Sequence, residues 1–294
     1  MSNSIALKKN VKTSVNYQLH DDYQPELGFV CRSMILASMP HSKVTGEVFT
    51  RSTKDFTLKI VGNELAGGVP YGSYPRLILS WVASEVVKTK DREIILGQSL
   101  SDFMKKLGLS VTGGRWGTVS RFKQQLKMVF SSSFSVTCLN KELQYYQFKE
   151  SGIRITDSAD IYWDPVNPEQ INLFKSKVVL SERFFEEITN TPIPIDVNAI
   201  NLLKKSSLAL DIYFWLTYRM FNIRKDTNIS FEQLFLQFGP GYQNSKHGRY
   251  EFKRQFITQL KKVLEIYNEA KVYENNKGIT LSPSPTHIKQ LQLI

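Results

Sequence analysis

The spacing of apolar residues alternates between two periods along this chain, which predicts short strands between amphipathic helices. In residues 48–62, VFTRSTKDFTLKIVG, apolar residues recur at every second position, as in a half-buried strand or hairpin. A helix is predicted from Pro75 (PRLILSWVASEVVKTK), followed by the strand REIILG and by a helix that Ser99 caps. A long helix then covers residues 115–130, and the period-2 segments FSVTCLN and LQYYQFKE predict a hairpin after it.

A second series of similar elements is predicted in the C-terminal half. It begins with the strand LFKSKVVLS, a helix capped by Ser181, the stiff segment TPIPID and a long helical pattern from residue 197. The segment ISFEQLFLQFG predicts a shorter helix, KHGRYEFKRQFITQLKKVLEIYNEA a long one, and KVYENNKGITLSP a hairpin. Helix, strand, helix, turn, longer helix and hairpin is the order of a winged helix-turn-helix domain. We therefore predict an α+β fold with two tandem winged helix-turn-helix domains, each with helices packed on a small antiparallel β-hairpin or sheet.

This pattern divides the chain into four predicted parts. Residues 1–28 are polar and weakly patterned, and are expected to form a flexible arm. Residues 29–170 form the predicted N-terminal winged-helix domain, residues 171–285 the C-terminal one, and residues 286–294 a tail. A chance likeness between two pairs of amphipathic helices is the alternative to a repeat. The matched order of the surrounding elements favours the repeat.

The charge balance favours an anionic partner. The chain has 38 Lys and Arg against 27 Asp and Glu, a formal net charge of +11. Its two cysteines, Cys31 and Cys138, lie in unrelated contexts, which argues against a disulfide scaffold and predicts a reducing compartment, the bacterial cytoplasm. No segment resembles a targeting signal or a membrane span, so neither export nor a membrane partner is expected.

The first long helix lies within residues 103–141, which contain no Asp or Glu. One helical stripe is predicted to pack in the core: Trp116, Val119, Phe122, Leu126, Val129 and Phe130. The opposite face carries small or polar side chains: Gly117, Ser120, Arg121, Gln124 and Met128. Small residues permit close approach to base edges, arginine can pair with guanine and glutamine with adenine. Arg115, Lys123 and Lys127 flank this face and suit phosphates, whereas an ordinary solvated face would be expected to mix charges.

The second long helix repeats this division less cleanly. Its predicted core stripe consists of Phe252, Phe256, Leu260, Val263, Leu264 and Tyr267. Its candidate DNA-binding residues are Lys246, His247, Arg249, Lys253, Arg254, Thr258, Lys261 and Lys262, with Lys277 in the following hairpin turn. Glu251 and Glu265 share the outward surface, so a solvated face is the alternative interpretation.

Enzymatic functions are disfavoured by the motifs. The sequence has no GxxxxGK[ST] phosphate loop, and its four histidines form no His-x-His or HExxH pair. Asp157 and Asp160 lie in TDSAD, which is interpreted as a solvated polar turn rather than a magnesium site. We therefore expect no catalytic residues, no metal and no cofactor.

Several long segments resemble one protein family. The segments VPYGSYPRLILSWVASEVVKTK, LGQSLSDFMKKLGL, TGGRWGTVSRFKQQLKMVFSSS, FKSKVVLSERFFEEI and PIPIDVNAINLLKKSSLALDIYFWLTYR resemble the plasmid-encoded RepA-type replication initiators, over about Met34 to Leu281. The resemblance implies a protein that binds repeated duplex sequences at a plasmid origin, helps open the duplex, and recruits the host helicase and polymerase machinery. It also implies two winged-helix domains and a shift between a homodimer that represses its own gene and a monomer that initiates replication.

The family motif TGGRWGTVSRFKQQL matches at residues 112–126. The resemblance therefore implies that Arg115, Thr118, Arg121 and Lys123 contact DNA or support that contact. A winged-helix transcriptional repressor with no replication role would share every feature of charge and helix face, and it remains the alternative function.

Overall fold

The computed structural model describes residues 5–6, 25–36, 39–53, 56–114, 117–140, 147–164 and 166–288. The chain divides into two compact units. The first comprises Phe29–Pro192 and is called the central unit below. The second comprises Met1–Gly28 together with Ile193–Ile294 and is called the terminal unit.

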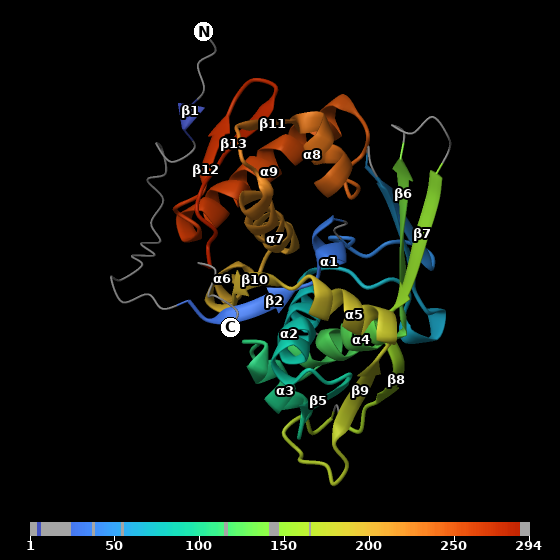
Figure 1. Ribbon diagram of the computed structural model, residues 1–294. Coiled ribbons are helices and arrows are strands. Elements are labelled where there is room, and N and C mark those ends of the chain that lie inside the picture. The colour runs from blue at the N-terminus through green and yellow to red at the C-terminus, as the bar shows by residue number, and fades with distance from the viewer. Residues whose placement is uncertain are drawn as a thin grey trace. The chain divides into compact units, whose positions relative to one another are not determined.

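The central unit combines five α-helices and one 3-10 helix with two sheets in its described part (Figure 1). Its helices are α1 (Arg32–Leu36), η2 (Glu64–Ala66), α2 (Ser73–Thr89), α3 (Leu100–Lys106), α4 (Thr118–Ser131) and α5 (Glu182–Asn190). Its strands are β3 (Val48–Ser52), β4 (Phe56–Val61), β5 (Glu93–Gly97), β6 (Ser133–Asn140), β7 (Gln147–Arg154), β8 (Thr156–Asp160) and β9 (Ser176–Leu180). The hairpin expected at residues 48–62 is confirmed as β3 and β4, and the Ser99 cap is confirmed by its bond from the Asp102 amide.

A three-stranded antiparallel sheet joins segments that lie far apart in the sequence. Its order is β5-β9-β8, so β9 pairs on one side with β5, about 80 residues earlier in the sequence. The strand expected to begin the second domain therefore belongs to the central unit. The helix after it, α5, joins the same core through Phe184 and Ile188. The units consequently divide after Pro192 instead of at the expected residue 170.

The hairpin predicted after α4 forms from β6 and β7, and the described second strand extends to Arg154, past the predicted segment LQYYQFKE. Strands β6 and β7 pair with each other from Ser133 opposite Arg154 to Asn140 opposite Gln147. β6 also pairs with β4, which gives a four-stranded sheet of order β3-β4-β6-β7. The segment interpreted as a polar turn, TDSAD, is strand β8 and pairs with β9 in the other sheet.

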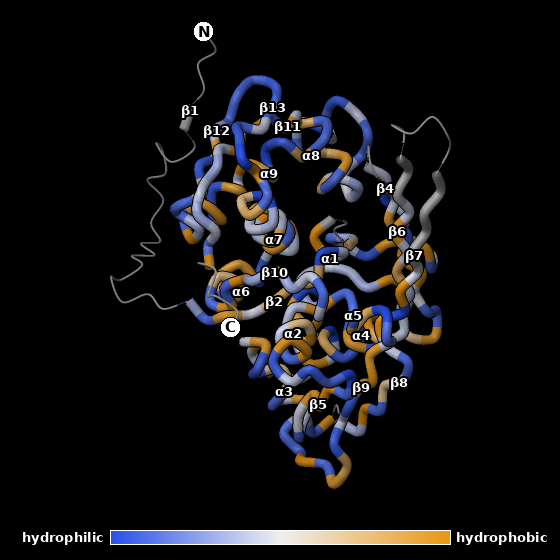
Figure 2. The backbone as a smooth tube through the Cα atoms, in the orientation of Figure 1, coloured by the Kyte–Doolittle hydropathy of each residue, from blue (hydrophilic) through white to orange (hydrophobic). Residues whose placement is uncertain are grey.

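The described part of the terminal unit contains four helices, a four-stranded sheet of order β1-β12-β13-β11 and the strand β10, which pairs with β2. Its helices are α6 (Val197–Leu203), α7 (Ser207–Asn222), α8 (Phe231–Phe238) and α9 (Lys246–Ile266). Its strands are β1 (Ile5–Ala6), β10 (Ile193–Asp196), β11 (Thr227–Ser230), β12 (Lys271–Glu274) and β13 (Gly278–Ser282), while β2 (Leu27–Val30) begins in this unit and pairs with β10. The segment expected as a stiff connection thus contains a strand. The predicted C-terminal hairpin is confirmed, and its hydrophilic tip is blue in Figure 2.

The two units repeat one order of elements: helix, strand, helix, helix, strand, strand. In the central unit these are α2, β5, α3, α4, β8 and β9, with the β6–β7 hairpin inserted between α4 and β8, and in the terminal unit α7, β11, α8, α9, β12 and β13. In both, the first strand pairs with the last, and the last pairs with the one before it. The terminal sheet has one more short strand, because β1 pairs with β12 at Ile5 and Ala6. The other described residues of the expected N-terminal arm, Pro25–Gly28, lead into or form part of β2.

A buried arginine fixes the entry to α2. Arg76 is 1% exposed, and its guanidinium donates hydrogen bonds to the carbonyl oxygens of Gly72 (2.6 Å), Met39 (2.7 Å) and Pro40 (3.4 Å). It thereby ties residues 39–40 to the turn before the helix. Buried carbonyls without donors are costly, so this cation satisfies backbone groups that the fold brings together.

Candidate nucleic-acid interface

Helices α3 and α4 are joined by a turn that two threonines close reciprocally. The Thr118 backbone amide donates to Thr112 Oγ1, and the Thr112 amide donates to Thr118 Oγ1, each at 3.0 Å. Thr118 Oγ1 also donates to the Ser110 carbonyl oxygen at 2.7 Å. These bonds satisfy amides that a helix start leaves free. Thr118 is therefore a positioning residue for the start of α4.

Gly117 permits this turn because it has no side chain. A Cβ atom at this position would overlap the carbonyl oxygens of Thr112 and Gly113. The terminal unit uses the same device, since a Cβ on Gly248 in α9 would overlap the Gln243 carbonyl oxygen. In both units the backbone five residues earlier passes directly against the glycine.

Substituting Gly117 by alanine is expected to disrupt the α3–α4 turn. Because the atoms met are backbone, the chain must shift to accept the methyl group, and we expect a loss of about 2 kcal/mol in the free energy of unfolding. Urea denaturation measures it. Gly113→Ala is the control, because a Cβ there has open space; equal losses in both variants would contradict the close approach.

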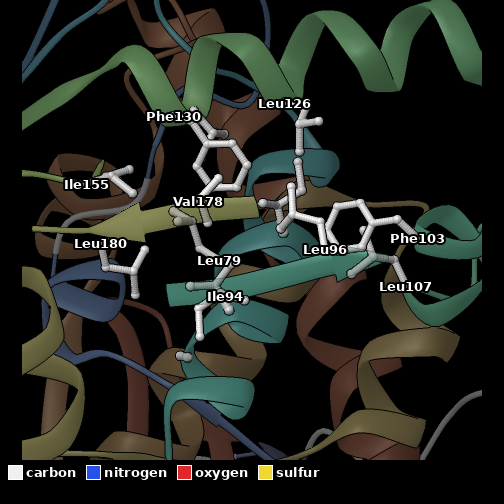
Figure 3. Close-up of a cluster of buried hydrophobic side chains, with 14 of the residues drawn as sticks. Leu79, Ile94, Leu96, Phe103, Leu107, Leu126, Phe130, Ile155, Val178 and Leu180 are labelled. Atoms are coloured by element: carbon white, nitrogen blue, oxygen red, sulfur yellow. The ribbon is translucent and has the colours of Figure 1, made fainter. Parts of the chain in front are cut away.

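The inward face of α4 is the predicted core stripe. Val119, Phe122, Leu126, Val129 and Phe130 are all buried, whereas Trp116 lies outside the described residues. Figure 3 shows Leu126 and Phe130 pointing from α4 toward the strands β5 and β9. The Phe122 ring lies 5.7 Å from the rings of Tyr74 in α2 and Phe103 in α3. This packing fixes which side of α4 faces outward.

The outward face of α4 presents polar side chains that are free of acidic partners. Ser120, Arg121, Gln124 and Lys127 are exposed, and none of them forms an ion pair with the described part of the chain. The internal bonds of this group are long: Arg121 Nε donates to the Gly117 carbonyl oxygen and Ser120 Oγ to that of Gly114, each at 3.4 Å. A guanidinium held this weakly is available to an external acceptor.

Two residues near this face differ from the expectation, and the prediction for a third lies outside the described residues. Met128 is fully buried instead of exposed, because the turn that follows η2 covers it. Lys123 is half-buried on the flank and lies near Asp164, whose pKa is lowered mainly by a hydrogen bond from Asn167 and slightly by this lysine. Arg115 lies outside the described residues. Among the described residues, the exposed cations of the face are therefore Arg121 and Lys127.

Helix α9 carries many more cations, but its own unit neutralises several of them. Arg254 pairs with Glu251 at 2.7 Å, and this hydrogen bond raises the arginine pKa. Arg249 lies 3.7 Å from Glu232, and Lys253 lies 3.7 Å from Glu274. These two cations also lie over aromatic rings, Arg249 over Phe235 and Lys253 over Phe231.

The other candidates of the terminal unit have separate environments. Lys246, His247, Thr258 and Lys262 are exposed, Lys261 is half-buried, and Thr258 Oγ1 is engaged with the Arg254 carbonyl oxygen at 2.8 Å. Lys277 is exposed at the tip of the β12–β13 hairpin, where Asn275 Oδ1 accepts from its amide and from that of Gly278. The predicted core stripe of α9 is confirmed, since Phe252, Phe256, Leu260, Val263, Leu264 and Tyr267 are buried.

The two long helices thus differ in how much of their charge is available to a partner. A polyanion on α4 meets Arg121 and Lys127, which form no ion pair with the described residues and can bind it without breaking one. On α9 it must displace Glu232, Glu251 or Glu274 to reach Arg249, Arg254 or Lys253, whereas Lys246 and Lys262 are exposed and in no ion pair with the described residues. Exposed ion pairs are weak and are screened by salt, so breaking them would lower the affinity of α9 for a polyanion without preventing contact.

The family is decided by a match that begins in the central unit and continues into the terminal unit. A family model described as plasmid encoded RepA protein matches residues 69–235. This range is more than half of the chain. The chain belongs to the plasmid-encoded RepA family. The RepA match contains α2, α3, α4 and most of α8, and it ends before α9 begins. The resemblance that the sequence segments carried is thereby confirmed.

One solved structure shows a similar fold to this RepA-family chain. Domains 2 and 3 of RctB, in a selenomethionine derivative, match with a TM-score of 0.53 at 12% sequence identity, over 88% of this chain and 97% of that one. Another structure of RctB domains 2–3 matches with a TM-score of 0.47 at 12% identity, over 83% and 92% of the two chains. No curated protein matches the chain.

The described residues of the RepA-family chain offer neither a membrane span nor a metal site. No helix among them is both long and apolar enough to cross a bilayer. No group of three His, Cys, Asp or Glu side chains there is arranged to hold a metal ion. Of the two neighbouring acids on β8, Asp157 forms an ion pair with Arg92 at 2.7 Å.

Proposed function

We propose that this RepA-family chain is a plasmid replication initiator that binds repeated duplex sequences at the origin through two winged helix-turn-helix units. The carrying observation is the outward face of α4, where Arg121 and Gln124 stand exposed on a helix without acids. The repeated order of elements supports the winged-helix interpretation, with α4 and α9 as recognition helices. The β8–β9 and β12–β13 hairpins then correspond to the wings.

The units are proposed to contribute unequally to binding. Helix α4 supplies free donors for base edges, with Arg121 suited to guanine and Gln124 to adenine. Helix α9 supplies a larger number of cations, of which three must exchange an internal carboxylate for a phosphate. We therefore assign most of the sequence preference to the central unit and much of the phosphate contact to the terminal unit.

Footprinting on the cognate plasmid origin tests the proposal. Protection of tandem direct repeats beside an AT-rich segment, together with strand opening detected by permanganate, is the expected result. Protection of one inverted repeat at a promoter, without opening, would favour a transcriptional repressor instead. Affinity should fall steeply with salt in either case, because each neutralised phosphate releases counterions.

The initiator role carries further proposals about partners. The family resemblance suggests recruitment of the host helicase and polymerase machinery in the bacterial cytoplasm, and a homodimer that represses its own gene. A purified chain that loads host helicase onto an opened origin in vitro would support recruitment. Sedimentation of the free and DNA-bound chain would establish whether a dimer exists and whether DNA dissociates it.

A further inference from the structure

The 3-10 turn η2 touches the outward side of α4. Gly67, directly after the turn, has a φ of +107°, and a Cβ there would lie 2.7 Å from Met128 Cε and 3.1 Å from Gln124 Nε2. The turn therefore covers Met128 and stops beside the exposed Gln124. Any partner that lies over Gln124 reaches this turn next.

The conformation of the turn is fixed by hydrogen bonds from its backbone amides to Asn63 and Glu64. Asn63 accepts from three amides, with its side-chain oxygen bonded to the Leu65 amide and its carbonyl oxygen to those of Ala66 and Gly68, all within 3.0 Å. The Gly67 amide donates to the Glu64 carbonyl oxygen at 2.9 Å. None of these bonds needs a side chain from Leu65 or Glu64.

The side chain of Leu65 is almost fully exposed to solvent and does not pack in the core. It is 97% exposed, although leucine is normally among the more buried residue types. Consecutive Cα atoms are about 3.8 Å apart, so Leu65 lies within roughly 8 Å of Gly67, which touches Gln124. A rigid apolar tip thus stands next to the candidate base-reading side chains.

We infer that the η2 turn is a second DNA-contact element of the central unit, in which Leu65 packs on apolar atoms at the edge of the major groove. This inference rests on the proposed function, because it takes the duplex to lie on α4. A recognition helix with its side chains nearly fills a groove about 12 Å wide, so a turn touching its side meets the groove edge. The apolar atoms found there are thymine methyl groups and deoxyribose carbons. The expected partner at this turn is duplex DNA, because the turn is continuous with the acid-free cationic face of α4.

Two substitutions in the turn have opposite expected effects on binding to the origin repeats. Leu65→Ala should weaken binding about five-fold without changing the salt slope, because it removes apolar contact and no charge. Glu64→Gln should strengthen binding about three-fold at low salt, because it removes a carboxylate that the phosphates repel. A structural defect would not strengthen binding. Fluorescence anisotropy with a labelled repeat duplex measures both.

The control is Leu202→Ala, which truncates a leucine that is 38% exposed on α6, outside the proposed recognition helices and wings. Loss of affinity in Leu65→Ala but not in Leu202→Ala supports the inference. Equal loss in both, or no loss in Leu65→Ala while Arg121→Ala binds poorly, overturns it and leaves the proposed function standing. Unchanged binding in both Leu65→Ala and Arg121→Ala would overturn the role of α4 as well.

Discussion

The double substitution Arg121→Ala and Gln124→Ala is expected to weaken binding to the origin repeats by about 100-fold. Each well-oriented side-chain pair with a base edge is worth about 1–3 kcal/mol, and the two residues lie on one exposed face. Binding to random duplex should fall much less, because only one phosphate-attracting charge is lost. Anisotropy titrations with repeat and random duplexes, at one salt concentration, measure the two affinities.

Helix α9 provides a matched control for this double substitution. Arg254→Ala with Gln255→Ala removes the same two residue types, but Arg254 already pairs with Glu251. We expect a loss of less than about ten-fold, spread evenly over specific and random DNA. If the α9 variant lost sequence preference and the α4 variant kept it, the assignment of the two helices would be reversed.

Replacing the buried Arg76 by alanine is expected to destabilise the central unit by about 4 kcal/mol. The change removes the donor from the Gly72, Met39 and Pro40 carbonyl oxygens, and each buried acceptor left without a partner costs about 1–3 kcal/mol. Chemical denaturation followed by circular dichroism measures the free energy of unfolding.

Arg183→Ala is the control for that measurement, because Arg183 is exposed and donates to the Gly152 carbonyl oxygen at 3.2 Å. It should cost less than about 1 kcal/mol. An Arg76→Ala protein as stable as the Arg183→Ala protein would show that the anchored residues 39–40 contribute little to the fold.

The helices are largely predictable because their evidence is local. The stripe of Phe122, Leu126 and Phe130 follows from helical spacing alone, and the structure buries all three. The Ser99 and Ser181 caps are equally visible, since a cap needs only a hydroxyl and a free amide three residues on.

Strand pairing is less predictable because its partners are distant. Strand β9 pairs with β5 across about 80 residues, and the local sequence of neither strand indicates which strand it pairs with. Strand β8 escapes prediction because only Thr156 of its residues is buried, so alternation between apolar and polar positions is absent. The neighbouring β6 and β7 have the clearer alternation, which explains why they are the strands expected to form the wing.

The candidate site is predictable in its side chains and much less so in their surroundings. The sequence identifies the acid-free face of α4, but not the turn after η2 that buries Met128. On α9, the pair between Glu251 and Arg254 has helical spacing and is available from the sequence. The acids Glu232 and Glu274 come from other elements, so only the fold reveals that they neutralise Arg249 and Lys253.

Strands β6 and β7 form a hairpin whose first and last residues lie side by side. Its first residue, Ser133, lies opposite its last, Arg154, and paired Cα atoms are about 5 Å apart. The hairpin thereby brings Thr156 of β8 back beside the end of α4, where its hydroxyl donates to the Phe130 carbonyl oxygen, although 24 residues separate Ser131 from Thr156. The number of residues in the β6–β7 hairpin therefore does not set the distance between the end of α4 and the start of β8.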